Sequence, residues 1–276
     1  MAPVPAIDAD GLTKRYGDET AVADLDLSIP SGTVYGFLGP NGAGKTTTMR
    51  MLTTLLRPSA GTARIAGESI ADRDAVTPNL GYLPEEPPLF DELTGREQVE
   101  YVAGLRDLPD AAATARIDDL FDRFDLTDDA DRRIDTYSKG MKQKTGIVQA
   151  ILHDPAVVFL DEPTSGLDPR AARTVRETIA ALAADDTTVV LSTHILPVVD
   201  ELADSVGVLY DGRLVAEGSP TDLKRRAAGE GERSLEDAFL AVTDEGGFDA
   251  TAESDDAAAV ATDTPTSGDS SRSEDD

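Results

Sequence analysis

The segment from Gly39 to Thr46 has residue types and spacing that could hold the phosphates of a nucleotide: Gly, four residues, then Gly-Lys-Thr. Glycines let backbone amides curl around phosphate oxygens, Lys45 can bridge the terminal phosphates, and the Thr46 hydroxyl can ligate Mg²⁺. The segment follows an apolar run at 34–38 and opens a helical pattern, which is the context the motif requires. The predicted nucleotide-binding residues here are Gly39, Pro40, Asn41, Gly42, Ala43, Gly44, Lys45, Thr46 and Thr47.

A second chemical pair, Asp161-Glu162, ends the apolar run 156–160. An acid at the tip of a parallel strand beside a phosphate-binding loop is placed to hold magnesium, and we expect Asp161 to do so. Glu162 is one residue further and is predicted to point to the other face of the strand end. There it could polarise an attacking water, so we expect it to be the catalytic base.

The elements that must position these residues alternate along the chain. Residues 5–38 are predicted to be rich in strands, and a helix is expected over 46–56, stopped by Pro58. Residues 94–152 are predicted to be helical, opening with a capping box at Thr94 and Glu97. Strands at 156–161, 187–192, 205–210 and 213–218 then alternate with helices from Arg170 and near 197–203. This order indicates an α/β fold with a largely parallel sheet.

The composition of the chain limits which binding partners and cellular compartments are expected. The 276 residues contain no Cys, and the net charge is −28, so nucleic acid is an improbable partner. The N-terminus lacks the features of a signal peptide, and no apolar run approaches the roughly 20 residues that span a bilayer. Only six lysines occur and the acids are spread along the chain, which favours adaptation to a salt-rich cytoplasm over simple solubility.

The motifs and their order resemble the ABC-transporter ATPase family over residues 5–240. Tyr16 lies in KRYGD and looks like the aromatic residue that stacks on adenine. The phosphate-binding loop is followed by GYLPEEP (81–87) at the glutamine loop, YSKGM (137–141) at the signature, FLDEP (159–163), SGLD (165–168) and STH (192–194). The resemblance implies a P-loop NTPase fold of the ABC type, with an N-terminal antiparallel β subdomain and an inserted helical subdomain at about 94–152. It also implies ATP and Mg²⁺ as ligands.

The resemblance further implies a head-to-tail dimer that sandwiches two nucleotides. Ser138 and the amides around Gly140 would complete the phosphate shell of the twin subunit, and Asp168 would communicate along the same seam. His194 would contact the γ-phosphate and help hold the catalytic water. His153 has no such context and is predicted to be structural.

Two positions depart from the commonest family pattern. Lys139 replaces a glycine of the signature and adds a cation near the partner's nucleotide. Glu85 stands where most members have Gln, and a carboxylate there can still coordinate Mg²⁺. We expect Glu85 to couple the nucleotide state to the membrane partner.

The closing SLEDAFL (234–240), together with YSKGM and GYLPEEP, is similar to the subfamily that drives exporters with separate permeases. The chain is therefore expected at the cytoplasmic face of the cell membrane, held there by permease subunits. A soluble ATPase of iron–sulfur assembly is the alternative that the sequence leaves open. Residues 241–276 carry eleven acids and one Arg, which predicts a disordered tail.

Overall fold

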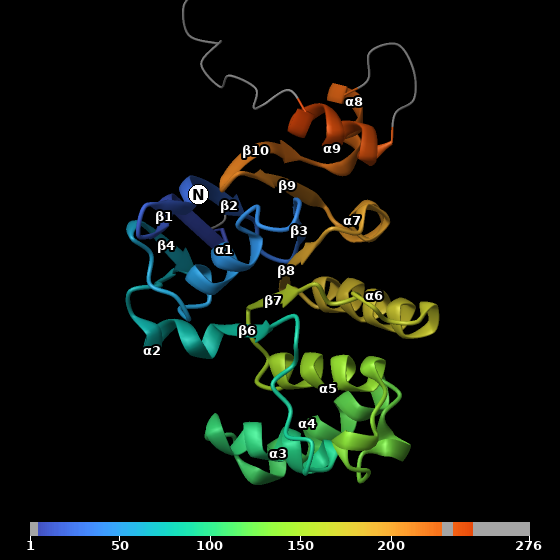
Figure 1. Ribbon diagram of the computed structural model, residues 1–276. Helices are drawn as coiled ribbons and strands as arrows, with labels where there is room; N and C mark the ends of the chain where they lie inside the picture. Colours follow the sequence, from blue (N-terminus) through green and yellow to red (C-terminus); the bar gives the residue numbers. More distant parts are fainter. Residues whose placement is uncertain (1–4, 228–233, 245–276) are drawn as a thin grey trace, which may run out of the picture.

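The computed structural model describes residues 5–227 and 234–244, and these form two sheets with helices around them (Figure 1). The first sheet is antiparallel and has the spatial order β2-β1-β4-β5. Its strands are β1 (Ile7–Tyr16), β2 (Glu19–Ile29), β4 (Ala60–Ile65) and β5 (Glu68–Ser69). This sheet is the antiparallel β subdomain that the family resemblance implied.

The second sheet has the order β10-β9-β3-β8-β7-β6 and is parallel except for β10 at its edge. Its strands are β3 (Val34–Leu38), β6 (Leu80–Leu83), β7 (Val157–Asp161), β8 (Thr188–Thr193), β9 (Ser205–Tyr210) and β10 (Arg213–Gly218). The carboxyl ends of β3, β7 and β8 lie side by side, so the residues that follow these strands meet at one edge. The prediction of a largely parallel sheet is confirmed.

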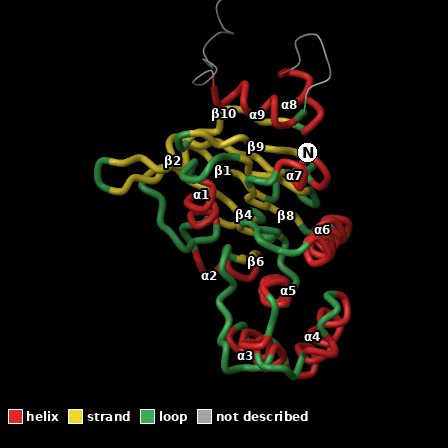
Figure 2. The backbone as a smooth tube through the Cα atoms, turned by 45° about the vertical axis from the view of Figure 1, so that its right-hand side comes forward, coloured by secondary structure: helices red, strands yellow, loops and turns green. Residues whose placement is uncertain are grey.

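Helices lie on both sides of the parallel sheet and form a separate layer below it (Figures 1 and 2). They are α1 (Lys45–Leu52), α2 (Arg73–Val76), α3 (Gly95–Leu105), α4 (Asp110–Arg123), α5 (Lys139–Ile151), α6 (Pro169–Ala184), α7 (Leu196–Leu202), α8 (Pro220–Ala227) and α9 (Leu235–Asp244). Short 3₁₀ turns occupy Thr77–Asn79, Thr127–Asp129 and Ile134–Thr136. No helix within residues 5–227 and 234–244 has both the length and the hydrophobicity needed to cross a membrane.

The parallel strands are apolar on both faces because both faces are covered. On β7, Val158 and Leu160 belong to a core shared with α5 and α6, whereas Val157 and Phe159 face a second core under the antiparallel sheet. The alternation follows the period of two along a strand. The helical layer of α3, α4 and α5 shares the first of these cores, so it packs directly on the sheet.

Several element boundaries differ from the prediction. Helix α1 ends at Leu52, not at 56, because the backbone turns left-handed at Thr54, which has a φ of 61°. Strands β4 and β6 were not predicted. The capping box at Thr94 is confirmed, with both of its reciprocal hydrogen bonds present. Helix α9 continues to Asp244, four residues into the segment predicted as tail, and residues 245–276 lie outside the described part of the chain.

His153 follows α5 and joins it to β6. Its Nε2 lies 2.9 Å from the Leu80 carbonyl oxygen, so Nε2 carries the proton, and Nδ1 is buried without a partner among the described residues. Burial, reinforced by the nearby charge of Arg106, lowers the pKa of His153 from 6.5 to about 4. These contacts agree with the structural role that the sequence predicted for His153.

This low pKa predicts a specific pH dependence of stability. Between pH 6.5 and about 4 the unfolded chain binds a proton at position 153 that the folded chain does not, so the free energy of unfolding falls as the pH is lowered through this window. We expect His153→Gln to lose less stability than the parent between pH 6.5 and 4.5, measured by denaturant unfolding at both values. Equal losses in the two proteins would contradict the assignment, since all other titrating groups are shared.

Candidate active site

The phosphate-binding loop (residues 39–46) joins β3 to α1 and is held close to neighbouring backbone. A Cβ atom on Gly39 would lie 2.4 Å from the Leu209 carbonyl oxygen, and one on Gly44 would lie 2.7 Å from the Ala21 carbonyl oxygen. Gly44 also has a φ of 101°, which L-residues rarely adopt. The glycines are therefore required both by the loop's conformation and by its packing.

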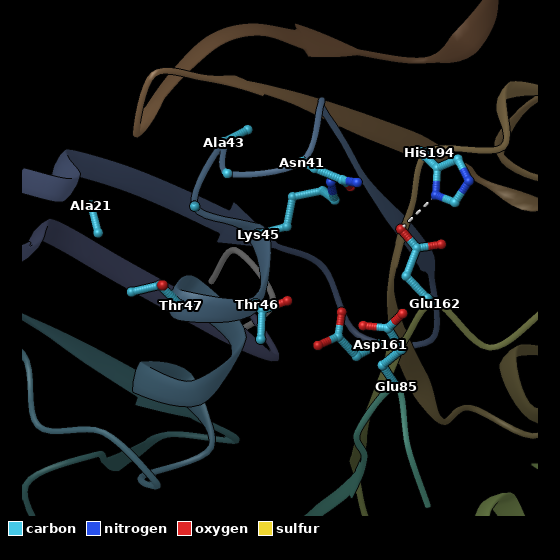
Figure 3. Close-up of a pocket in the computed structure, with 12 residues that line it drawn as sticks. Ala21, Asn41, Ala43, Lys45, Thr46, Thr47, Glu85, Asp161, Glu162 and His194 are labelled. Carbon is cyan, nitrogen blue, oxygen red and sulfur yellow. Dashed lines mark hydrogen bonds and ion pairs between the residues drawn. The ribbon is translucent and has the colours of Figure 1, made fainter. Parts of the chain in front are cut away.

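The loop forms one wall of a cleft of about 340 Å³ (Figure 3). The cleft brings together most of the residues predicted to act on nucleotide, and one more from β2. Its lining residues are Ala21, Asn41, Gly42, Ala43, Gly44, Lys45, Thr46, Thr47, Glu85, Asp161, Glu162 and His194. Gly39 and Pro40 do not line the cleft, but their carbonyl oxygens accept hydrogen bonds from Lys45 Nζ, at 2.6 and 3.0 Å.

Lys45 is a buried cation opposite three carboxylates. Burial lowers the pKa of Lys45, while the charges of Glu162, Asp161 and Glu85 act in the opposite direction. Figure 3 shows the three carboxylates across the cleft from the loop. The cleft therefore offers a positive charge and backbone amides on one side and acceptor oxygens on the other, which suits a metal-bound polyphosphate.

Asp161 and Glu162 are fixed by the pairing of β7 with β8. Asp161 lies opposite Ser192 in the register, and the Ser192 hydroxyl donates a hydrogen bond to Asp161 Oδ1. The Glu162 amide donates to the Ser192 carbonyl oxygen at 3.0 Å. Both acidic side chains are buried, Asp161 being 2% and Glu162 9% exposed.

Glu162 combines a strained backbone with an unsatisfied side-chain oxygen. Its φ of 49° lies in the left-handed region, which costs a non-glycine residue about 1 kcal/mol or more. His194 Nδ1 lies 3.0 Å from Glu162 Oε1, so Nδ1–H donates to the carboxylate. Glu162 Oε2 is buried and has no hydrogen-bond partner among the described residues. A carboxylate oxygen held in this way is placed to accept a proton from a bound water.

The oxygen atoms that line the cleft are of the kind that binds Mg²⁺. No group of three or more His, Cys, Asp or Glu within the described residues could hold a metal ion by itself. Mg²⁺, however, commonly binds through one or two carboxylates, with water and substrate phosphates completing its shell. The oxygens of Thr46, Asp161 and Glu85 line one cleft and fit that pattern.

The signature residues lie elsewhere. Ser138 caps the N-terminus of α5, accepting from the Met141 amide at 3.2 Å, and Asp168 caps α6, accepting from the Arg170 and Ala171 amides. A Cβ atom on Gly140 would lie 2.9 Å from the Ala171 Cβ, so α5 and α6 begin side by side. None of these four signature and seam residues (Ser138, Lys139, Gly140 and Asp168) lines the cleft.

Lys139 and Tyr16 take positions that the sequence did not specify. The Lys139 side chain lies against Gly166 of its own chain. A Cβ atom on Gly166 would be only 2.4 Å from Lys139 Nζ. Tyr16, at the end of β1, is 50% exposed and does not line the cleft, and Lys14 Nζ lies 5.2 Å from its ring centroid.

Ser192 is the site residue that sequence reasoning missed. It stands in the motif STH, but its role depends on the β7–β8 register, which the sequence does not reveal. We expect Ser192→Ala to reduce ATP turnover about tenfold and to raise the Mg²⁺ concentration needed for half-maximal activity, because Asp161 loses its orienting donor. Steady-state assays across a Mg²⁺ titration would measure both effects. An unchanged Mg²⁺ requirement would contradict this role.

Comparisons with known proteins agree with this geometry. A family model described as "ABC transporter" matches residues 22–165. The chain is 43% identical over 226 residues to the daunorubicin resistance ATP-binding protein DrrA3 of Streptomyces coeruleorubidus, covering 82% of this chain and 72% of that protein. It is 35% identical over 222 residues to the bacitracin transport ATP-binding protein BcrA of Enterococcus faecalis, covering 80% and 71%. A solved structure described as the ATP-binding subunit of an ABC transporter has a TM-score of 0.79 at 32% identity, covering 86% of this chain and 99% of that chain.

Proposed function

The chain belongs to the ABC transporter family, and on this premise we propose that it is the ATP-hydrolysing subunit that energises export through a separate membrane permease. The observation that carries the proposal is the cleft in which Lys45 and the phosphate-binding loop face Glu162, whose Oε2 is buried and unpaired within the described residues. Relatives named for drug resistance and bacitracin transport favour export over iron–sulfur assembly.

In the proposed reaction the phosphate-binding loop and Lys45 hold the β- and γ-phosphates of ATP. Glu162 Oε2 accepts a proton from the water whose oxygen attacks the γ-phosphorus, and ADP leaves as the bond to the bridging oxygen breaks. His194 donates to Glu162 Oε1 and thereby orients the carboxylate. Thr46, Asp161 and Glu85 would hold the Mg²⁺ that binds with the nucleotide, which would neutralise part of the phosphate charge.

We further propose that the working unit is a head-to-tail dimer. The signature residues Ser138 and Gly140 lie at the N-terminus of α5, where the helix dipole favours an anion, yet they are not part of their own cleft. A twin subunit in head-to-tail orientation would bring them to the opposite face of its γ-phosphate. Asp168 and Lys139, beside them, would lie along the same seam. Tyr16 would stack on the adenine.

The permease is proposed to bind the outer side of the helical layer. The docking loop (residues 87–91) lies between β6 and α3, and Phe90 is 50% exposed. Its ring packs edge-on against Tyr101 of α3, with centroids 5.6 Å apart, and Leu105 of the same helix is also exposed. Such an apolar patch suits a partner that is itself apolar and membrane-embedded. This contact would hold the chain at the cytoplasmic face of the membrane.

Co-purification from detergent-solubilised membranes of the native organism tests this function. A tagged chain is expected to bring with it a protein with several membrane spans, in an amount comparable to its own. The double variant Phe90→Ser, Tyr101→Ser should lose that partner but keep ATP binding. Recovery of the chain alone, with full ATPase activity, would contradict the transporter assignment.

Glu85 gives a second test, because it is exposed in the loop that leaves β6 for α3 and also lines the cleft. We expect Glu85→Ala to reduce substrate transport in vesicles by at least tenfold while leaving ATP affinity within about twofold, because one weak metal ligand contributes little to binding. Glu86→Ala, one residue away and also exposed, is the control. Unchanged transport by Glu85→Ala would refute the coupling role.

A further inference from the structure

A buried amide network lies behind the docking loop. Gln98 of α3 is 1% exposed, and its Oε1 accepts a hydrogen bond from the Phe90 amide at 2.9 Å. The Phe90 amide is a donor, so oxygen has to face it, and this fixes the orientation of the Gln98 side chain. Its Nε2 then faces two acceptors, Gln149 Oε1 at 3.3 Å and the Pro88 carbonyl oxygen at 3.5 Å.

Helix α5 contacts the docking loop along one face. Lys142, Gly146 and Gln149 are spaced i, i+4 and i+7, so they lie on the same side of the helix. Lys142 Nζ is 2.6 Å from Asp91 Oδ1. A Cβ atom on Gly146 would lie 2.8 Å from the Pro87 Cβ, which means that the loop packs directly on the helix backbone. The loop therefore contacts α5 at Pro87 and Asp91, and Gln98 links the residues between them to Gln149 of α5.

The other end of the same helix carries the signature. α5 has 13 residues, so it is a rod of about 20 Å, and Ser138 caps its N-terminus. Figures 1 and 2 show α5 lying between the sheet and the α3–α4 pair. If the signature is displaced, α5 can move as a rigid rod and carry the displacement to the docking loop. The backbone conformation of α5 need not change.

We propose that Gln98, with Gln149, is a positioning residue that fastens the permease-facing docking loop to the signature helix, so that the two move as one body when the nucleotide dimer closes. This inference rests on the proposed function, because it needs the closing of two subunits on ATP. It names the side chains that transmit that closure to the surface where the permease binds.

The three attachments differ in strength. Lys142 and Asp91 form a partly exposed ion pair, with side chains 33% and 58% exposed, and such pairs contribute little. The packing of Pro87 on Gly146 contributes dispersion attraction, which is weak for each atom pair and not directional. The Gln98 hydrogen bonds are buried and directional, and breaking them would leave the Phe90 amide without its acceptor. Gln98 is therefore the attachment whose removal should free the loop.

Hydrogen exchange of the full chain in a Glu162→Gln background tests the proposal. In this parent, MgATP is expected to slow exchange both at 138–142, through the partner's nucleotide, and at 87–91. Adding Gln98→Met, which keeps the side-chain volume but removes all three hydrogen bonds of the Gln98 side chain, should leave the slowing at 138–142 intact. The slowing at 87–91 should shrink about fivefold, which is the loss expected from one hydrogen bond.

Gln143→Met is the matched control, because Gln143 is, like Gln98, a buried glutamine, but it lies on α5 and its Nε2 has no partner among the described residues. It should keep both responses. Equal slowing of 87–91 in the parent and in Gln98→Met would overturn the proposal. If Gln98→Met lacks a cooperative unfolding transition, Gln149→Met decides in the same way, since it cuts the link to α5 and spares the Phe90 bond. A parent without slowing at 138–142 would instead contradict the nucleotide dimer, and the proposal would fall with it.

Discussion

Replacing Glu162 by Gln is expected to lower ATP turnover about a thousandfold, within the range that a general base contributes, while MgATP still binds. The substitution preserves side-chain volume and the acceptor near His194 Nδ1, but the amide cannot take a proton from water. Lys45, the phosphate-binding loop and Asp161 are untouched, so the affinity for ATP should change by less than about threefold.

Because the bound ATP would persist in this variant, the head-to-tail dimer should accumulate. Size-exclusion chromatography with light scattering, at high KCl and saturating MgATP, would show a dimer for Glu162→Gln and a monomer without nucleotide. Glu68→Gln, an exposed glutamate on the antiparallel sheet, is the control and should hydrolyse ATP at the parent rate. A Glu162→Gln protein that stays monomeric under these conditions would refute the dimer.

The second large effect concerns salt. We propose that the acidic surface is an adaptation to high ionic strength, and we expect the free energy of unfolding to rise by about 5 kcal/mol between 0.1 and 2 M KCl. Unit charges about 10 Å apart repel by about 0.4 kcal/mol in water, and dozens of such pairs act at low salt but are screened near 1 M. The melting temperature should rise by about 10 °C or more.

The ion pairs within the chain neutralise only part of its negative charge. Twelve ion pairs between Arg or Lys and carboxylates join residues that the structure describes, whereas the chain has 53 carboxylates and 25 cations. Asp8 and Asp10 are exposed on β1 near Asp26 and Glu217, and form no ion pair with any described residue.

Thermal unfolding of Asp8→Asn, Asp10→Asn across a KCl series provides the matched test. This variant should be more stable than the parent in 0.1 M KCl and should gain less from added salt, because two charges are removed from the repulsive cluster. A parent with full stability at 0.1 M KCl, or a variant with an unchanged salt dependence, would contradict the proposal.

The sequence predicted the elements whose identity is local and missed those that depend on pairing. The phosphate-binding loop and the apolar strand before Asp161 could be recognised because glycine spacing and continuous hydrophobicity are local signals. Strand β6 has only four residues, and it is a strand because Leu80 and its neighbours pair with Val157 to Leu160 of β7. That partner lies more than 70 positions away, so no local pattern reveals it.

The same distinction applies to the site. The sequence grouped Lys45, Asp161, Glu162 and His194, and the structure places all four in one cleft. The contact between Ser192 and Asp161 follows from the register of two strands, and the left-handed backbone of Glu162 follows from the turn after β7. The position of the Lys139 side chain against Gly166 likewise depends on how α5 packs beside α6. None of these was available from residue types alone.

The positive φ at Glu162 means that thermal stability and ATP hydrolysis favour different residues at this position. Glycine there would relieve the backbone, and we expect a library selected for heat resistance alone to enrich Glu162→Gly, although this change removes the carboxylate that we propose as the general base. Directed evolution for thermal stability should therefore keep the Glu162 codon fixed and vary other positions.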